Sequence, residues 1–343
     1  MSHFKIAIIG ATGVLGHQLL SNLAHDIEGS SKNFEVTAVA SKKSIGREVS
    51  FGEDQVLKIK SIEAFIADHK DDSEAYDFIF NTMPKTAAEK WSKDLITLSK
   101  HYIDLSYASN LLAETKLISI LRKDKQGTDG KDKIFAIPSA ASIAVAQLFD
   151  VLKENDFSPN RAIATCHYAA SENGKAAMDE LYDQAKKTFV HQNLKIQHYD
   201  KQIAFNMLPV HGLLQSDGQL QSEWLMRGEL QKLGHKDVPL SSRVINVPVF
   251  IGTTISLYVE FDREEILSDD VKKKMSLENN LILVDRQDRD NAFTSIDCAG
   301  QDQILVSRVS EDWSSENAIN FWLGVDNLNL RTMLAIKLMF SLI

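Results

Sequence analysis

An apolar segment at the N-terminus leads directly into a glycine-rich turn and then into an amphipathic segment. Residues 4–9 (FKIAII) are almost wholly apolar, residues 10–16 (GATGVLG) hold three glycines, and Leu19, Leu20 and Leu23 recur at helical spacing. This order predicts a strand, a tight turn and a helix. In dinucleotide-binding folds the first glycine permits the turn, the second lets the backbone approach a diphosphate, and the third lets helix and strand pack closely. The alternative is a helix start that merely tolerates glycine.

The end of the second predicted strand, residues 34–39, indicates which nucleotide is expected. NAD-selective folds place an acidic residue there to accept from the ribose 2′-hydroxyl, whereas this chain reads ASKKS at residues 40–44. Lysines and hydroxyls suit a 2′-phosphate, so we expect NADP rather than NAD; a solvated basic loop is the alternative. The predicted cofactor-binding residues are Gly10, Thr12, Gly13, Val14, Leu15, Gly16, Ser41, Lys43 and Ser44.

The rest of the chain predicts two domains of different texture. Strand-like segments at 75–80, 101–104 and 133–136 alternate with helical stretches, as in a parallel sheet, and a polar loop spans 122–133. From about residue 161 long strands (161–170 and 244–261) and a helix (174–187) indicate a mixed or antiparallel sheet with helices on one face, and residues 327–343 indicate a buried helix. The expected fold class is α/β, with an N-terminal Rossmann-like doubly wound parallel sheet (1–140 plus 326–343) and a second α+β domain (141–325).

Composition limits the partners and cofactors to be expected. The 343 residues carry a formal net charge of −9, which argues against nucleic acid as a partner. No apolar stretch reaches the roughly 20 residues of a bilayer span, and a core strand begins within a few residues of Met1, so we expect a cytoplasmic protein without a signal peptide or membrane segment. The two cysteines, Cys166 and Cys298, are read as packing residues, and the ten histidines lack metal-ligand spacing, so no metal is predicted.

Blocks along nearly the whole chain resemble aspartate-semialdehyde dehydrogenase, and more closely the Usg group of dehydrogenase-like proteins. Their order and spacing carry the resemblance: residues 10–16, 40–46, 102–104, 171 with 174–178, 205–209, 222–224, 247–252 and 326–328. The resemblance implies an NADP-binding domain and a dimerisation domain. It also implies reductive dephosphorylation of an aspartyl phosphate through a thioester, in which a cysteine attacks, a histidine moves protons, and arginines with a lysine hold the anionic groups.

The same resemblance places the family's site positions on side chains that cannot perform those roles. The nucleophile falls on Ala140, the base on Thr253, the substrate-carboxylate arginine on Asn246, the phosphate arginine on Asn110, the lysine on Leu225, the substrate glutamate on Ser222 and a glutamine on Tyr168. Ser139 and Ser142, beside the missing thiol, are expected to be helix caps. Arg243 lies three residues from Asn246, so on a strand it should face the opposite side. Near the nicotinamide, Glu172 replaces a glycine, and residues 330–333 (LRTM) are expected to crowd the cofactor.

Three functions follow as hypotheses. The first is a protein inactive in the family reaction that keeps the nucleotide-binding framework and forms a homodimer through residues 247–259 and Trp224, unless these are simply core; a heterodimer with an active paralogue is also possible. The second is an NAD(P)-dependent oxidoreductase acting on an aldehyde or oxo group without a cysteine nucleophile, with Tyr168, Tyr107 or Lys175 as the acid. The third, an intact aspartate-semialdehyde dehydrogenase, requires the chemistry without its nucleophile.

Overall fold

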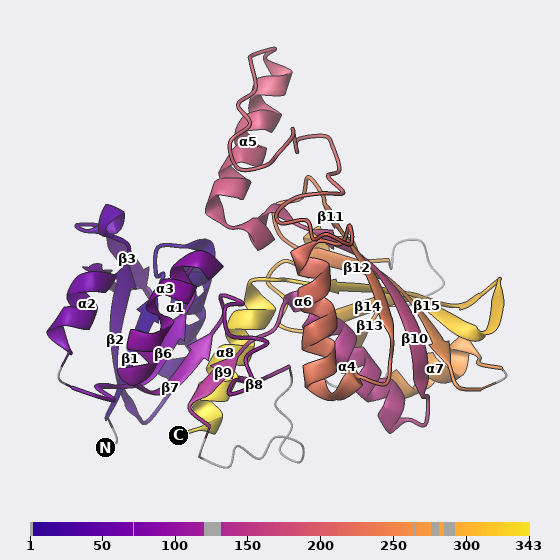
Figure 1. The fold of residues 1–343 in the computed structure, drawn as a ribbon, viewed down its shortest axis with the longest axis horizontal. Coiled ribbons are helices and arrows are strands. Elements are labelled where there is room, and N and C mark those ends of the chain that lie inside the picture. The colour runs from indigo at the N-terminus through magenta and orange to yellow at the C-terminus, as the bar shows by residue number, and fades with distance from the viewer. Residues whose placement is uncertain (1–2, 71, 120–131, 264, 276–280, 285–291) are drawn as a thin grey trace. The chain divides into compact units, whose positions relative to one another are not determined.

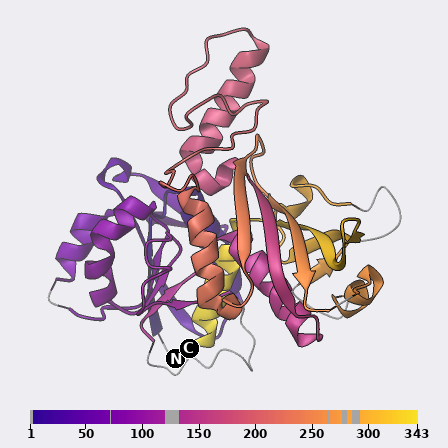
Figure 2. The same ribbon diagram turned by 45° about the vertical axis from the view of Figure 1, so that its right-hand side comes forward.

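The chain divides into two compact units, Met1–Pro138 with Arg331–Ile343 and Ser139–Leu330. The computed structural model describes residues 3–70, 72–119, 132–263, 265–275, 281–284 and 292–343, and Figures 1 and 2 draw it from two directions. Most of the predicted polar loop at 122–133 lies outside the described residues.

The first unit is built on a seven-stranded sheet in the order β5-β2-β1-β6-β7-β9-β8, in which every pairing is parallel. The strands are β1 (His3–Ile9), β2 (Asn33–Ala40), β5 (Lys60–Ser61), β6 (Tyr76–Asn81), β7 (Ser99–Asp104), β8 (Lys116–Leu117) and β9 (Ile134–Ala136). A separate hairpin joins β3 (Glu48–Phe51) and β4 (Gln55–Lys58). The strand order reverses between β1 and β6, which is the point where doubly wound sheets bind nucleotides. The predicted Rossmann-like parallel sheet is confirmed.

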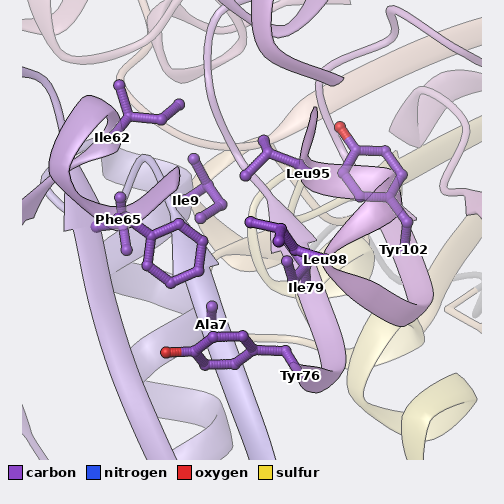
Figure 3. Packing of buried hydrophobic residues seen from close by; sticks show 10 residues of the cluster. Ala7, Ile9, Ile62, Phe65, Tyr76, Ile79, Leu95, Leu98 and Tyr102 are labelled. Atoms are coloured by element: carbon purple, nitrogen blue, oxygen red, sulfur yellow. The ribbon is translucent and has the colours of Figure 1, made fainter. Parts of the chain in front are cut away.

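Helices pack on the sheet of the first unit. They are α1 (Val14–Glu28), the short helix η1 (Lys42–Ser44), α2 (Ile62–Asp68), α3 (Lys85–Thr97) and α8 (Asn329–Ser341). Phe65 of α2 and Leu95 of α3 pack against strand residues such as Ile9 and Ile79 (Figure 3). The last four residues of β1 are all buried, which explains why this strand reads as a continuous apolar run. A 2.9 Å hydrogen bond from Asn22 to Thr332 joins α1 to α8.

The second unit is an α+β domain, as expected. Its six-stranded mixed sheet has the order β11-β10-β12-β15-β14-β13. The strands are β10 (Pro159–Tyr168), β11 (Leu240–Asn246), β12 (Thr253–Phe261), β13 (Leu281–Leu283), β14 (Ile304–Asp312) and β15 (Ser315–Val325); the helices are α4 (Ala140–Glu154), η2 (Ala170–Asn173), α5 (Lys175–Phe189), α6 (Gln221–Leu230), η3 (Gln231–His235), α7 (Ser268–Met275) and η5 (Ile296–Cys298). Helix α4 packs on β10, β12 and β15, while α5 projects beyond the sheet (Figures 1 and 2).

The prediction of a single strand over residues 244–261 is wrong. Strand β11 ends at Asn246 and pairs parallel with β10, and β12 begins at Thr253 and pairs antiparallel with the other side of β10. The six residues between them cross from one side to the other. Pro248 has no N–H to donate to a sheet, and Gly252 has a φ of +101° at a place where a Cβ would collide with the carbonyl of Ser295. The crossing brings the end of β11 and the start of β12 to either side of Tyr168 at the end of β10.

Candidate functional site

The glycine-rich turn of the first unit has the geometry that the sequence predicts. Gly10 has a φ of +89°, and a Cβ there would lie within 2.8 Å of Thr82 Oγ1. A Cβ on Gly16 would collide with the carbonyl of Gly10, so the third glycine is needed for close packing of helix and strand. Gly13 is the N-cap of α1. Because it has no side chain, it leaves the N–H groups of the first turn uncapped, as an anion-binding helix start requires. Val14 and Leu15 form the first turn of α1 and are half-buried.

The predicted 2′-phosphate segment lies beside this turn. Ser44 is buried in η1, and its Oγ lies 3.3 Å from Oγ1 of Thr12. Ser41 and Lys43 are exposed, and the N–H of Ser44 donates to the carbonyl of Ser41 over 2.9 Å. The structure therefore brings together the glycine turn and the segment after β2, within one unit.

A buried carboxylate fixes the loop that follows β7. Asp104 is fully buried; its Oδ1 accepts from the N–H of Ser106 over 2.8 Å, and its Oδ2 accepts from the N–H of Ser109 over 2.9 Å. Asn81 donates to Asp104 Oδ1 over 3.0 Å. These bonds hold the chain up to Asn110, which is fully buried and donates to the carbonyl of Ile137 over 3.4 Å. Asn110 is thus held by the backbone of its own unit.

The start of α4 carries the position that the resemblance assigns to the nucleophile. Ala140 is the first residue of the helix and is fully buried. Ser139 is the N-cap, as predicted, and its hydroxyl accepts from the N–H of Ser142 over 3.2 Å. The same prediction is wrong for Ser142, which lies inside the helix as its third residue. The carboxylate of Glu229, on α6, accepts from the N–H of Ser139 over 3.2 Å and lies 2.9 Å from its Oγ. An internal carboxylate therefore lies at the positive end of this helix.

The base and carboxylate-binding positions of the resemblance lie at one edge of the second unit's sheet, where each has an internal hydrogen bond. Thr253 is fully buried, and its Oγ1 donates to Oε1 of Glu172 over 2.8 Å. Asn173 donates to Oδ1 of Asn246 over 2.7 Å. Tyr168 pairs in register with Asn246, so it belongs to the same edge. Two successive residues of η2, Glu172 and Asn173, thus contact two of the substituted positions.

The resemblance assigns two further site positions to α6, Ser222 and Leu225. Ser222 and Leu225 are both half-buried. Between them, Glu223 is buried and accepts from the N–H of Leu220 over 2.8 Å and of Val244 over 2.9 Å, which fastens α6 to β11. Arg243 is exposed whereas Asn246 is buried, so the two face opposite sides of β11, as predicted.

Both thiols of the chain are buried, as predicted for packing residues. Burial, with smaller contributions from the charges of Glu172 and Glu223, raises the pKa of Cys166 to about 12. Burial likewise raises the pKa of Cys298 to about 12, helped by Asp297 and Asp326. At neutral pH the thiolate fraction is then on the order of one in 100,000, and the thiolate is the nucleophilic form.

Sequence reasoning did not find the roles of Glu229 and Asn173, or that Glu172 contacts Thr253. One signal was present: Glu223, Met226 and Glu229 recur every three residues on one face of α6, which places acidic residues among buried apolar ones. No comparable signal pairs Asn173 with Asn246, because 73 residues separate them.

Within the described part of the chain, no group of three or more histidine, cysteine, aspartate or glutamate residues is arranged to hold a metal ion. The helices of those same residues include none long and apolar enough to cross a membrane.

Comparison with protein families gives a consistent match in both units. The family described as semialdehyde dehydrogenase, NAD binding domain, matches residues 5–120, and the semialdehyde dehydrogenase dimerisation domain matches residues 151–330. The aspartate-semialdehyde dehydrogenase of Rickettsia bellii is 34% identical over 330 residues, which cover 95% of this chain and 93% of that protein.

Solved structures share the fold. The aspartate semialdehyde dehydrogenase II of Vibrio cholerae, solved with ASA, has a TM-score of 0.87 at 22% identity and covers 100% of this chain and 98% of its own. The aspartate semialdehyde dehydrogenase of Candida albicans, solved with NADP, has a TM-score of 0.68 at 15% identity, with 100% of both chains covered. At these identities the likeness concerns the fold alone.

Proposed function

The chain belongs to the aspartate-semialdehyde dehydrogenase family, and we propose that it is a nucleotide-binding homodimer that does not catalyse the family reaction. In this proposal it stands with the Usg group of paralogues that lack the catalytic residues. The observation that carries it is the state of the thiols: Ala140 occupies the nucleophile position, and both cysteines of the chain are buried with a pKa of about 12. A thioester route has no thiolate to start from.

The hydrogen bond of Thr253 supports the same conclusion. A base for this chemistry needs a pKa near the working pH, which a threonine hydroxyl does not have. Here the hydroxyl is fully buried and already donates to Glu172. Asn246, in turn, presents an amide where the resemblance requires a cation, and its oxygen accepts from Asn173. Thr253 and Asn246 therefore already have hydrogen-bond partners within the chain.

The proposed ligand is NADP, with NAD bound more weakly. Thr12 and Ser44 connect the glycine turn to the segment after β2, and Ser41 and Lys43 are exposed beside them. In this proposal Lys43 meets the 2′-phosphate as a point charge. The NADP present in the Candida albicans relative supports this choice. Titration calorimetry with both nucleotides tests it: equal affinity for NADP and NAD would contradict a 2′-phosphate site, and Lys43→Ala should reduce the preference.

Within the predicted dimer segment 247–259, Val247, Ile255, Leu257 and Val259 are buried in the unit's own core, so the homodimer is proposed instead from the exposed apolar side chains of the second unit. Exposed apolar side chains recur between residues 182 and 214: Tyr182, Phe189, Val190, Ile196, Phe205, Met207, Val210, Leu213 and Leu214. Phe189 and Phe205 are 74% and 62% exposed, and their rings stack edge-on at 5.4 Å. Trp224 on α6 is also 48% exposed. Side chains of this size in water favour burial against a second chain.

Light scattering at micromolar concentration tests the assembly. We expect a dimeric mass for the wild type and a shift toward the monomer for Phe205→Glu. The matched control is Val56→Glu, which places the same charge on an equally exposed apolar residue, 57% exposed, of the first unit. A monomeric wild type would refute the proposal. If the protein instead pairs with an active paralogue, co-expression of the two chains would give a complex with the summed mass of one copy of each.

Inactivity is tested directly by two measurements on the wild-type protein, one of NADPH formation and one of cysteine alkylation. Supplied with aspartate semialdehyde, phosphate and NADP, it should produce no NADPH, and an alkylating reagent should label neither cysteine until the chain is unfolded. Turnover with labelling of a native cysteine would refute the proposal. Turnover of other aldehydes that is lost in Tyr168→Phe would instead support the oxidoreductase hypothesis. Of its other candidate acids, Lys175 is exposed and ion-paired with Asp179 at 3.0 Å.

A further inference from the structure

A buried arginine lies at the carboxyl edge of the first unit's sheet. Arg331, in the first turn of α8, is only 4% exposed. Its guanidinium donates to the carbonyls of Leu105 over 2.6 Å, Pro138 over 2.9 Å and Ile137 over 3.4 Å. Leu105 directly follows β7, and Ile137 directly follows β9. The charged group therefore lies across the ends of two neighbouring strands.

The guanidinium is fixed in this position. Its central carbon lies 4.2 Å from the centre of the Tyr107 ring, a cation–π contact, and Tyr107 itself has a φ of +69°. Among the residues that the structure describes, no carboxylate lies within ion-pair distance of Arg331. Three carbonyl dipoles and one ring face thus compensate a buried positive charge, and moving the side chain would break all four contacts.

The place of Arg331 matters for the nucleotide. In a doubly wound sheet a dinucleotide lies across the point where the strand order reverses, with one half on each side. Here that point lies between β1 and β6, and the segment after β2 lies on the adenosine side. The second half would extend over the ends of β6, β7 and β9. Arg331 and Tyr107 lie at the ends of the last two of these strands.

We propose that Arg331 and Tyr107 occupy the place of the nicotinamide half, so that this nucleotide site binds an adenosine diphosphate-type ligand and gains no affinity from nicotinamide. The inference rests on the proposed nucleotide-binding function. The backbone carbonyls of Leu105, Ile137 and Pro138 at this edge already accept from Arg331. The oxidised nicotinamide ring is itself a cation, which a permanently charged guanidinium repels.

The test compares two ligands that differ only by nicotinamide, NADP and 2′-phospho-ADP-ribose, by calorimetric titration of the wild-type protein. We expect dissociation constants within about threefold of each other, since the added ring makes no contact. In Arg331→Ala, NADP should bind at least about tenfold more tightly than in the wild type, while the fragment should be unchanged. The matched control is Lys337→Ala, an exposed residue of the same helix, which should alter neither value.

The outcomes separate the two proposals. A wild type that binds NADP about tenfold or more tightly than the fragment would overturn the role of Arg331 and leave nucleotide binding intact. Absence of binding for both ligands would overturn nucleotide binding itself, and this inference with it. If Arg331→Ala does not fold, saturation-transfer NMR on the wild type decides: transfer to adenine protons alone supports the inference, and equal transfer to nicotinamide protons contradicts it.

Discussion

Replacing Ser139 by alanine should cost more stability than removing a helix cap alone. The change removes the acceptor for the N–H of Ser142, a loss of about 1 kcal/mol for a typical N-cap. It also removes a hydroxyl that lies 2.9 Å from the fully buried carboxylate of Glu229. Depriving a buried carboxyl oxygen of one donor costs about 1–3 kcal/mol. We therefore expect Ser139→Ala to lower the free energy of unfolding by about 2–4 kcal/mol.

A matched cap in the first unit provides the control. Ser61 caps α2 by accepting from the N–H of Ala64 over 3.2 Å, and no hydrogen bond joins its hydroxyl to a carboxylate in the described structure. Ser61→Ala should cost only about 1 kcal/mol. Urea titration followed by far-UV circular dichroism measures both changes.

A double-mutant cycle isolates the contact between the two residues. Combining Ser139→Ala with Glu229→Gln should reveal a coupling energy of about 1 kcal/mol or more, because the two side chains interact directly. If Ser139→Ala lowers the free energy of unfolding no more than Ser61→Ala, and the coupling energy is zero within error, then the contact with Glu229 does not stabilise the start of α4.

Three further results are expected. Ala140→Cys should give no measurable NADPH from aspartate semialdehyde, because Thr253 still cannot move protons; appreciable turnover would show that the positions are misassigned. Gly16→Ala should weaken nucleotide binding about tenfold or more in calorimetry, since its Cβ would collide with the carbonyl of Gly10; unchanged binding would contradict the packing argument. Burial acts to raise the pKa of Asp77, but hydrogen bonds from Lys100 and the backbone leave this pKa below its usual value. Asp77→Asn should therefore cost about 0.5–1 kcal/mol at neutral pH, and this difference should vanish as pH falls through the lowered pKa; a difference in unfolding free energy that persists in acid would refute the assignment.

The fold was accessible from sequence wherever local patterns decide structure. The turn at Gly10 and the cap at Ser139 depend on neighbouring residues, and both were predicted correctly. The two-sided burial of β1 also follows from its uninterrupted apolar run. Strand propensity alone could not separate β11 from β12, because residues 247–252 are as apolar as the strands around them. There Pro248 and Gly252 were the only local evidence of a crossing.

The candidate site was less accessible because its contacts join distant residues. Ser139 meets Glu229 across 90 positions, and Thr253 meets Glu172 across 81. The resemblance predicted which positions carry different side chains from the family, but it carried no information on what those side chains contact. That information depends on the sheet order, which places the ends of β10, β11 and β12 side by side.

The bond between Thr253 and Glu172 limits which side chains position 253 can accept. A histidine introduced there would displace the hydroxyl that donates to Glu172, and it would have to fit a site with no exposed surface. The two positions are therefore coupled: a larger side chain at 253 would need a compensating change at 172 before the fold could accept it.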